Sequence, residues 1–295
     1  MKSPAYGTPE WHAERRTGLG GSDIAAVCGL SRFRGPFDVY ADKTGQAAPL
    51  VDTPALYWGR VLEEVVAREW SKRHGQRIRR RAAMVRHPAE SWMYAHLDFD
   101  IPGTDGVLEI KTAAHYAADK FGEQGSSEIP GEYLLQVQWE LACAGKQTGH
   151  VAVLIGGRDY RDYEIARDDE IIGQLMTIGR EFWFEHVQKG VPPDLDGSDA
   201  AGRYLAQRYP KDTGAEIEAD EHLSGLMQDY VRLTAEVGDR EQTKRLIGQQ
   251  LQAAMGEATT LRGPFARATW RFVRGASYTV NRPESRRFVV SEIDE

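Results

Sequence analysis

The amino-acid sequence predicts a mixed α/β (α+β) fold, in which a central mixed β-sheet is flanked by helices. Segments with helical periodicity come first, and strand-like segments then alternate with further helices, an order typical of this class. Of the 295 residues, 41% are hydrophobic, which is enough for a substantial core. A stretch with Pro and Gly at 191–214 is expected to link a core of residues 1–190 to a C-terminal appendage of residues 215–295.

Helix signals dominate the first quarter of the chain. Thr8 and Pro9 are the residue types found where helices begin, and Ser22 is expected to cap a second helix after a run of glycines. A later amphipathic helix is expected to bury its apolar side, which consists of Leu56, Leu62, Val65, Val66 and Trp70. The helices expected in this region span residues 9–16, 23–28, 36–43 and 53 to about 74.

The middle of the chain alternates strand and helix signals, and the C-terminal appendage is expected to begin with a helical hairpin turning around Gly238. Short strands are expected to follow this hairpin. The strands expected along the chain span residues 78–85, 92–100, 106–112, 151–156, 160–166, 259–274 and 278–290, and the helices span 130–144, 168–188, 215–235 and 239–255.

Composition excludes several classes of protein. The formal net charge of -7 argues against a partner held by bulk positive charge, but a local basic groove can still bind nucleic acid. Cys28 and Cys143 lie in apolar surroundings, so we expect reduced core residues, and two thiols are too few for an iron–sulfur cluster. The sequence shows no secretory h-region and no stretch of roughly 18 apolar residues. We therefore expect a cytoplasmic protein without a membrane partner.

A charged hairpin carries the strongest functional signal. Side chains two apart on a strand share a face, so Glu109 and Lys111 are expected to point the same way while Ile110 faces the core. A Pro/Gly turn would bring Asp98 beside them, and Asp100, which has the same parity, is the alternative aspartate. The charges are either a solvated strand face or a buried site. Buried carboxylates are costly unless they are paired or coordinate a metal such as Mg²⁺.

Two predicted helices carry further polar candidates. Glu63 lies at the border of an apolar face, so it is either an ordinary surface glutamate or a further carboxylate of a metal site. Gln136 and Gln138 lie in a mostly apolar helix, where an amide is either a satisfied core group or one that orients a water or a phosphate. The two glutamines lie about 200° apart around the helix, so we expect different roles for them.

A candidate anion site precedes the second predicted helix. Gly20 and Gly21 expose backbone N–H groups before Ser22, and Arg15 is a charged group that can bind the same anion. The signal is weak by itself, because many helices begin this way. The arginines within 77–81 are either a solvated strand or contacts to a DNA backbone.

Taken in order, these motifs resemble the YqaJ-type viral recombinase family, the phage lambda exonuclease branch of the PD-(D/E)XK nucleases. The resemblance covers roughly residues 9–190, and Leu97 stands where the superfamily name has proline. The matching stretches are Trp11-His12…Arg15…Gly20-Gly21-Ser22-Asp23-Ile24, Trp58-Gly59…Glu63, Leu97-Asp98…Leu108-Glu109-Ile110-Lys111-Thr112 and Tyr133…Gln136-Val137-Gln138-Trp139.

The resemblance implies a restriction-endonuclease-like core and digestion of duplex DNA ends in the 5′-to-3′ direction with Mg²⁺, for which Mn²⁺ can substitute. It also implies a role for each matching residue of the site. The residues are Asp98, Glu109, Glu63 and Ile110 at the metal, Lys111 at the attacking water, Gln136 at the reacting phosphate, and Arg15 with Ser22 at the 5′-phosphate.

We therefore predict a DNA exonuclease that leaves 3′ single strands for phage-type recombination, in the cytoplasm of a bacterial host if a phage encodes it. The alternatives are a restriction-type or RecB-like endonuclease of the same superfamily and a non-catalytic DNA-binding protein on a degenerate nuclease fold. By resemblance, the expected partners are double-stranded DNA ends, a single-strand annealing protein and further copies of the chain in a ring-like trimer. The region after about Pro193 shows no catalytic constellation.

Overall fold

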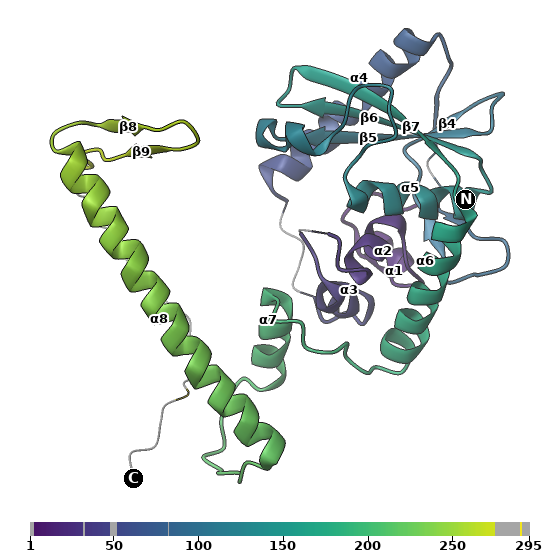
Figure 1. Cartoon of the computed structure of the whole chain (residues 1–295). Coiled ribbons are helices and arrows are strands. Elements are labelled where there is room, and N and C mark those ends of the chain that lie inside the picture. The colour runs from purple at the N-terminus through teal and green to yellow at the C-terminus, as the bar shows by residue number, and fades with distance from the viewer. Residues whose placement is uncertain (1–2, 32, 48–51, 82, 275–289, 291–295) are drawn as a thin grey trace. The chain divides into compact units, whose positions relative to one another are not determined.

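The computed structural model describes residues 3–31, 33–47, 52–81, 83–274 and 290 (Figure 1). The chain divides into two units, Met1–Leu205 and Ala206–Glu295. The helices of the first unit are α1 (Pro9–Arg15), α2 (Gly21–Val27), α3 (Pro36–Lys43), α4 (Pro54–His74), η1 (His115–Lys120), α5 (Gly131–Ala144), α6 (Asp169–Glu181) and the π-helical turn η2 (Phe182–Gln188) that continues it.

A five-stranded mixed sheet forms the centre of the first unit, in the order β1-β4-β5-β6-β7. The central strand β5 pairs antiparallel with β4 and parallel with β6, as expected for a mixed sheet. A second, two-stranded sheet joins β2 and β3. The strands are β1 (Arg79–Arg80), β2 (Val85–Arg86), β3 (Tyr94–Ala95), β4 (Phe99–Ile101), β5 (Gly106–Ala113), β6 (Thr148–Ile155) and β7 (Asp159–Ala166).

Helices cover both faces of this sheet. On one face, α4 packs Val66, Ala67 and Trp70 against the apolar residues of β4 and β5. On the other face, α5 and α2 contact one another over a larger apolar cluster that includes Val107 and Val137. The predicted class, a mixed sheet between helices, is confirmed. Because β5 is covered on both sides, any charged side chain on it must find a partner within the protein.

The two strands predicted before β5 are interrupted. Each yields two short pieces, of which β1 and β4 join the main sheet while β2 and β3 form the small one. The arginine-rich stretch provides no apolar face, and both residues of β1 are exposed. On α4, Leu56 and Val65 are exposed rather than inward, because the buried face of the helix is narrower than predicted.

The first turn of α2 differs from the prediction in its cap. Gly20 is the N-cap, and the carboxylate of Asp23 accepts a hydrogen bond from the Gly20 N–H at 2.9 Å. Ser22 lies inside the helix and is exposed, so its assignment as the cap is wrong. By contrast, the Thr8 cap of α1 is confirmed, since its hydroxyl accepts from the Trp11 N–H.

The second unit contains one long helix instead of the predicted hairpin. Helix α8 (Glu221–Met255) runs through Gly238 without a break, because a single glycine costs a helix only about 1 kcal/mol. A hairpin of strands β8 (Thr260–Arg262) and β9 (Arg267–Thr269) follows it. The strand predicted over 278–290 lies, apart from its last residue, outside the described residues.

Residues 191–214, expected as a linker, contain helix α7 (Asp199–Arg208). Both cysteines are free thiols, and Cys143 is buried. No helix in the described part of the chain combines the length and the apolar character needed to cross a membrane.

Candidate active site

The β4–β5 hairpin brings the predicted charges together. Phe99 pairs with Leu108, so Asp98, one residue before β4, lies level with Glu109 on the neighbouring strand. The Asp98 Oδ2 atom accepts a hydrogen bond from the Ile110 backbone N–H at 2.8 Å. Two residues after Glu109, Lys111 donates from Nζ to Glu109 Oε1 at 2.7 Å. The expected convergence of two carboxylates and one ammonium group is therefore present.

Helix α5 supplies the other side of this cluster. Its Gln136 amide donates to Glu109 Oε1 at 2.7 Å and to Glu140 Oε1 at 2.8 Å, while its Oε1 atom accepts from Lys111 Nζ at 2.9 Å. The Lys111 ammonium also lies 5.0 Å from the centroid of the Tyr133 ring. Positions 133, 136 and 140 share a face of α5 because they are three and four residues apart. Hydrogen bonds from this face of α5 therefore connect the Glu109–Lys111 pair of β5 to Gln136 and Glu140 in one polar network.

The electrostatics of the cluster are those of a crowded anionic site. Burial, and then the charges of Glu109 and Glu63, raise the pKa of Asp98 well above its usual value. Burial and the charge of Glu109 likewise raise the pKa of Glu140. Burial opposes protonation of Lys111, but the charge and hydrogen bond of Glu109 outweigh it and raise the lysine pKa. A single ammonium group therefore faces several carboxyl groups that repel each other.

One buried oxygen of this network has no partner. Glu109 is only 4% exposed, and its Oε2 atom forms no hydrogen bond with any residue that the structure describes. A buried carboxylate oxygen without a donor is costly, and a divalent cation is the ligand that would satisfy it and reduce the repulsion from Asp98. The hard oxygen donors of these two residues fit Mg²⁺, which is bound through one or two carboxylates together with water and phosphate.

Glu63 comes from the opposite layer of the fold. It lies on α4, and its Oε1 atom accepts from Arg80 Nη1 at 2.6 Å. Its charge still contributes to the raised pKa of Asp98. Among the described residues, no group of three or more His, Cys, Asp or Glu side chains is arranged to hold one ion. The geometry is thus that of a two-carboxylate centre with Glu63 nearby and paired.

The two candidate aspartates occupy different environments. The carboxylate of Asp100 is held by Arg79 and Arg81, each at 3.1 Å. Asp98 instead faces β5 and the Glu109 side chain, as its hydrogen bond to Ile110 and the influence of Glu109 on its pKa indicate. Of the two, Asp98 is therefore the one placed to share a cation with Glu109.

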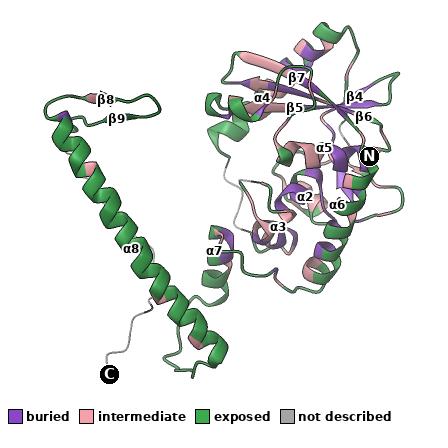
Figure 2. Ribbon diagram, viewed as in Figure 1, coloured by how far each residue is buried: buried purple, intermediate pink, exposed green. Residues whose placement is uncertain are grey.

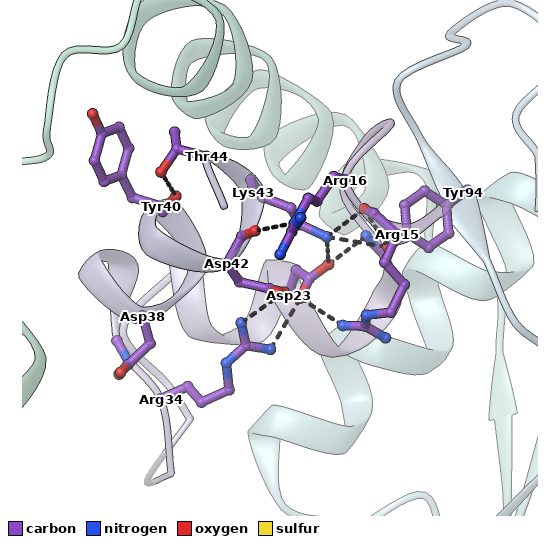
Figure 3. A network of polar contacts seen from close by, with 12 residues as sticks. Arg15, Arg16, Asp23, Arg34, Asp38, Tyr40, Asp42, Lys43, Thr44 and Tyr94 are labelled. Atoms are coloured by element: carbon purple, nitrogen blue, oxygen red, sulfur yellow. Dashed lines mark hydrogen bonds and ion pairs between the residues drawn. The ribbon is translucent and has the colours of Figure 1, made fainter. Parts of the chain in front are cut away.

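A second charged cluster surrounds Asp23, which is fully buried (Figure 3). Lys43 Nζ lies 2.6 Å from its Oδ2 atom, and Arg34 Nη1 and Arg15 Nη2 lie 3.1 and 3.2 Å from its Oδ1 atom. Lys43 also donates to the hydroxyl of Tyr94 at 3.1 Å. The three cations hold the pKa of Asp23 well below its usual range although burial opposes this. The cluster holds three cations against one fully buried carboxylate.

The two clusters adjoin each other through the start of α2. A Cβ atom placed on Gly21 would lie 3.0 Å from Gln136 Cγ and 3.3 Å from Glu140 Oε1. Any larger residue at this position would press on the Gln136 and Glu140 side chains, because the helix approaches the network so closely. Ser22 follows Gly21 in α2, and Arg15 is held by Asp23, the next residue of the same helix.

The sequence assigned no role to several members of these clusters, among them the partners Arg34 and Lys43 of Asp23. Asp23 stood inside a quoted motif without a role, and Glu140 directly follows the quoted stretch that ends at Trp139. The spacing of four residues between Gln136 and Glu140 was a usable signal, because it places them on one helical face. The different role expected for Gln138 is confirmed: its amide bonds Ala166 O and the Asp168 N–H, which tie the core together.

Comparisons with known proteins agree with this architecture. The model of the YqaJ-like viral recombinase domain matches residues 10–147. The protein YqaJ of Bacillus subtilis (strain 168) is 34% identical over 262 residues, which cover 87% of this chain and 81% of that protein. Protein D345L of African swine fever virus (strain Badajoz 1971 Vero-adapted) is 36% identical over 63 residues, 21% of this chain and 18% of that protein.

Among solved structures, an alkaline exonuclease (LHK-Exo) from Laribacter hongkongensis matches 69% of this chain and 98% of its own, with a TM-score of 0.50 and 20% identity. The two chains therefore share a fold. The chain belongs to the YqaJ-like viral recombinase family.

Proposed function

We propose that the chain is a Mg²⁺-dependent DNA exonuclease that digests the 5′-ended strand of duplex DNA ends and leaves 3′ single strands. The observation that carries this proposal is the buried, unpartnered Oε2 atom of Glu109 beside Asp98, with Lys111 on the same face. Buried ionisable groups with perturbed pKa values and unsatisfied atoms are concentrated at the functional sites of proteins. Family membership supports phosphodiester bonds of DNA as the substrate.

Each residue of the network has a part in the reaction. Asp98 and Glu109 would hold the cation, with Ile110 of β5, whose backbone N–H already binds Asp98, and Glu63 of α4 as further members of the site. When bound, the cation polarises the scissile phosphate and lowers the pKa of the attacking water. Lys111 places a positive charge where negative charge develops on the phosphate. It is held in position by the carboxylate of Glu109.

The α5 side of the network orients the reacting groups. Gln136 bonds Glu109, Glu140 and Lys111 together, so its amide fixes the position of the lysine ammonium and of the carboxylate. Burial and the charge of Glu109 raise the pKa of Glu140, the carboxyl group that anchors the far side of the Gln136 amide. Gln136 is therefore a positioning residue in the structure without DNA. Its role at the reacting phosphate is the one that the resemblance to the family implies.

The cluster around Asp23 is proposed as the site of the 5′-phosphate. Arg15 is presented by its ion pair with Asp23 and by packing against the Trp11 ring, 4.8 Å from the ring centroid. The three cations outnumber the carboxylates of Asp23 and Asp42, which favours an anion, and Ser22, the residue before Asp23, offers an exposed hydroxyl. A bound terminal phosphate here would select free 5′ ends, which is what distinguishes an exonuclease from an endonuclease.

The test is a nuclease assay with Mg²⁺ on three DNA substrates: linear duplex with 5′-phosphate, the same duplex with 5′-hydroxyl, and closed circular duplex. We expect release of mononucleotides carrying a 5′-end label, preference for the phosphorylated end, and intact circles. Nicked circles would assign the chain to the endonucleases, and DNA binding without turnover would make it a non-catalytic binding protein. Either outcome would refute the proposal. The annealing partner and the ring-like trimer stay predictions of the resemblance.

A further inference from the structure

Helix α8 presents an apolar stripe on the surface of its unit. It has 35 residues and is about 52 Å long at 1.5 Å per residue. Only its last residue, Met255, is buried, and Figure 2 shows the rest of the helix exposed almost throughout. Leu233, Val237 and Ile247 are each at least half exposed, at 51%, 55% and 51%. Contiguous exposed apolar surface of this kind marks an interaction site.

The spacing of the stripe identifies the kind of partner. Its positions alternate steps of three and four residues along the whole helix, and eight of the ten positions are apolar. A period of 3.5 residues is the signature of a coiled coil, in which each seam residue inserts between residues of a second helix. The ten seam positions are Leu223, Leu226, Tyr230, Leu233, Val237, Arg240, Lys244, Ile247, Leu251 and Ala254.

Glycines within α8 indicate that packing stabilises the helix. Gly225, Gly238 and Gly248 lie inside it, and none occupies a seam position. Each lowers the intrinsic stability of an isolated helix. Long helices in proteins owe most of their stability to packing of an apolar face. The described residues leave half or more of Leu233, Val237 and Ile247 exposed, so within the described part of the chain these positions lack such packing.

The charge distribution selects the orientation of the partner. Residues 221–239 carry four acidic side chains and one arginine, a net charge of 1 − 4 = −3. Residues 240–255 carry three basic side chains and one glutamate, a net charge of 3 − 1 = +2. Arg232 of the first half is already paired within the helix, with Asp229 and Glu236. An antiparallel copy of α8 would therefore place each acidic half against a basic half.

We propose that α8 pairs with α8 of a second copy of this chain as an antiparallel two-stranded coiled coil. The seam is symmetric about the middle of the helix, so Arg240 meets Val237 of the second copy, flanked by the acidic side chains of its Glu236 and Glu241. A parallel, in-register pair would instead face Arg240 with Arg240 and Lys244 with Lys244, and such like-charge contacts are unfavourable. Antiparallel pairing also sets the two helix dipoles in opposition.

Cysteine cross-linking in the full-length chain tests the orientation. In the antiparallel register Leu226 faces Leu251 of the second copy, whereas the two copies of Leu226 lie about 38 Å apart. We expect Leu226→Cys/Leu251→Cys to form disulfide-linked dimers on mild oxidation, while Leu226→Cys and Leu251→Cys alone, like the unsubstituted chain with its two native cysteines, do not. Cross-linking of either single variant would indicate parallel pairing and overturn the proposal, as would the absence of cross-linking in the double variant.

Light-scattering mass of the full-length chain tests the seam independently of orientation. Leu233→Glu/Ile247→Glu introduces two charges into the seam, and the mass should fall twofold. The matched control Gln228→Glu/Gln242→Glu adds the same charge on the opposite side of α8 and should leave the mass unchanged. An unchanged mass for the seam variant, or an equal fall for the control, would overturn the proposal. The measurement does not depend on nuclease activity.

Discussion

Replacement of Asp23 by asparagine should cost the fold several kilocalories per mole. The ammonium of Lys43 lies 2.6 Å from the Asp23 carboxylate, and both side chains are completely buried. Asparagine keeps the size of the side chain but removes the charge that stabilises Lys43 there. Breaking a buried pair in this way costs about 3–5 kcal/mol, or roughly two to four powers of ten in the unfolding equilibrium.

The assay is urea unfolding at pH 7, with Asp42→Asn as the matched control. Asp42 pairs with Arg34 at 3.5 Å and is partly exposed, so its loss should cost within about 1 kcal/mol. Equal free energies of unfolding for the two variants would refute the reasoning.

The pH dependence of the free energy of unfolding tests the same ion pair. Because the folded pKa of Asp23 lies below its unfolded value, its stabilisation is present above about pH 4 and is lost as the pH falls below it. The difference between wild type and Asp23→Asn should shrink in that acid range.

Three further predictions concern the reaction. Lys111→Ala should lower kcat by about 10²–10³-fold while DNA binding, measured by fluorescence anisotropy, is retained; near-normal turnover would refute its assigned role. Asp98→Asn should abolish cleavage at every Mg²⁺ concentration, whereas Asp100→Asn should retain activity within a fewfold, and the reverse order would exchange the two aspartates. Arg15→Ala should reduce the preference for 5′-phosphorylated over 5′-hydroxyl ends by about tenfold or more, while equal preference in variant and wild type would exclude it from the phosphate site.

The local sequence pattern predicted the structure correctly where contacts within one helix, strand or turn determine it. The alternation in Glu109-Ile110-Lys111 fixed which side chains share a face, because successive residues of a strand point to opposite sides. The Pro/Gly turn then fixed that Asp98 would reach them. The same holds for the Thr8 cap of α1 and for the bounds of α1, α3 and α5, which the sequence predicted closely.

The local sequence pattern gave a wrong prediction where contacts with distant parts of the chain compete with local ones. Ser22 is a good capping residue, yet Asp23 bonds the Gly20 N–H, because the buried carboxylate is also fixed by three cations from other parts of the chain. The hairpin predicted around Gly238 fails for a related reason. A glycine weakens a helix only slightly, and the seam continues with the same period on both sides of it.

The sequence by itself determined the mixed fold, the hairpin of charges and the family. Tertiary structure alone decided that Glu63, on the opposite layer, pairs with Arg80, and that Glu140 closes the network from α5. It also decided that Asp23 forms an ion pair with Lys43, which lies twenty residues away in the chain. The physical reason is that these interactions join residues at different separations along the sequence. Backbone periodicity and capping act over a few residues, whereas the pairing of buried charges depends on which helices the packed core brings together.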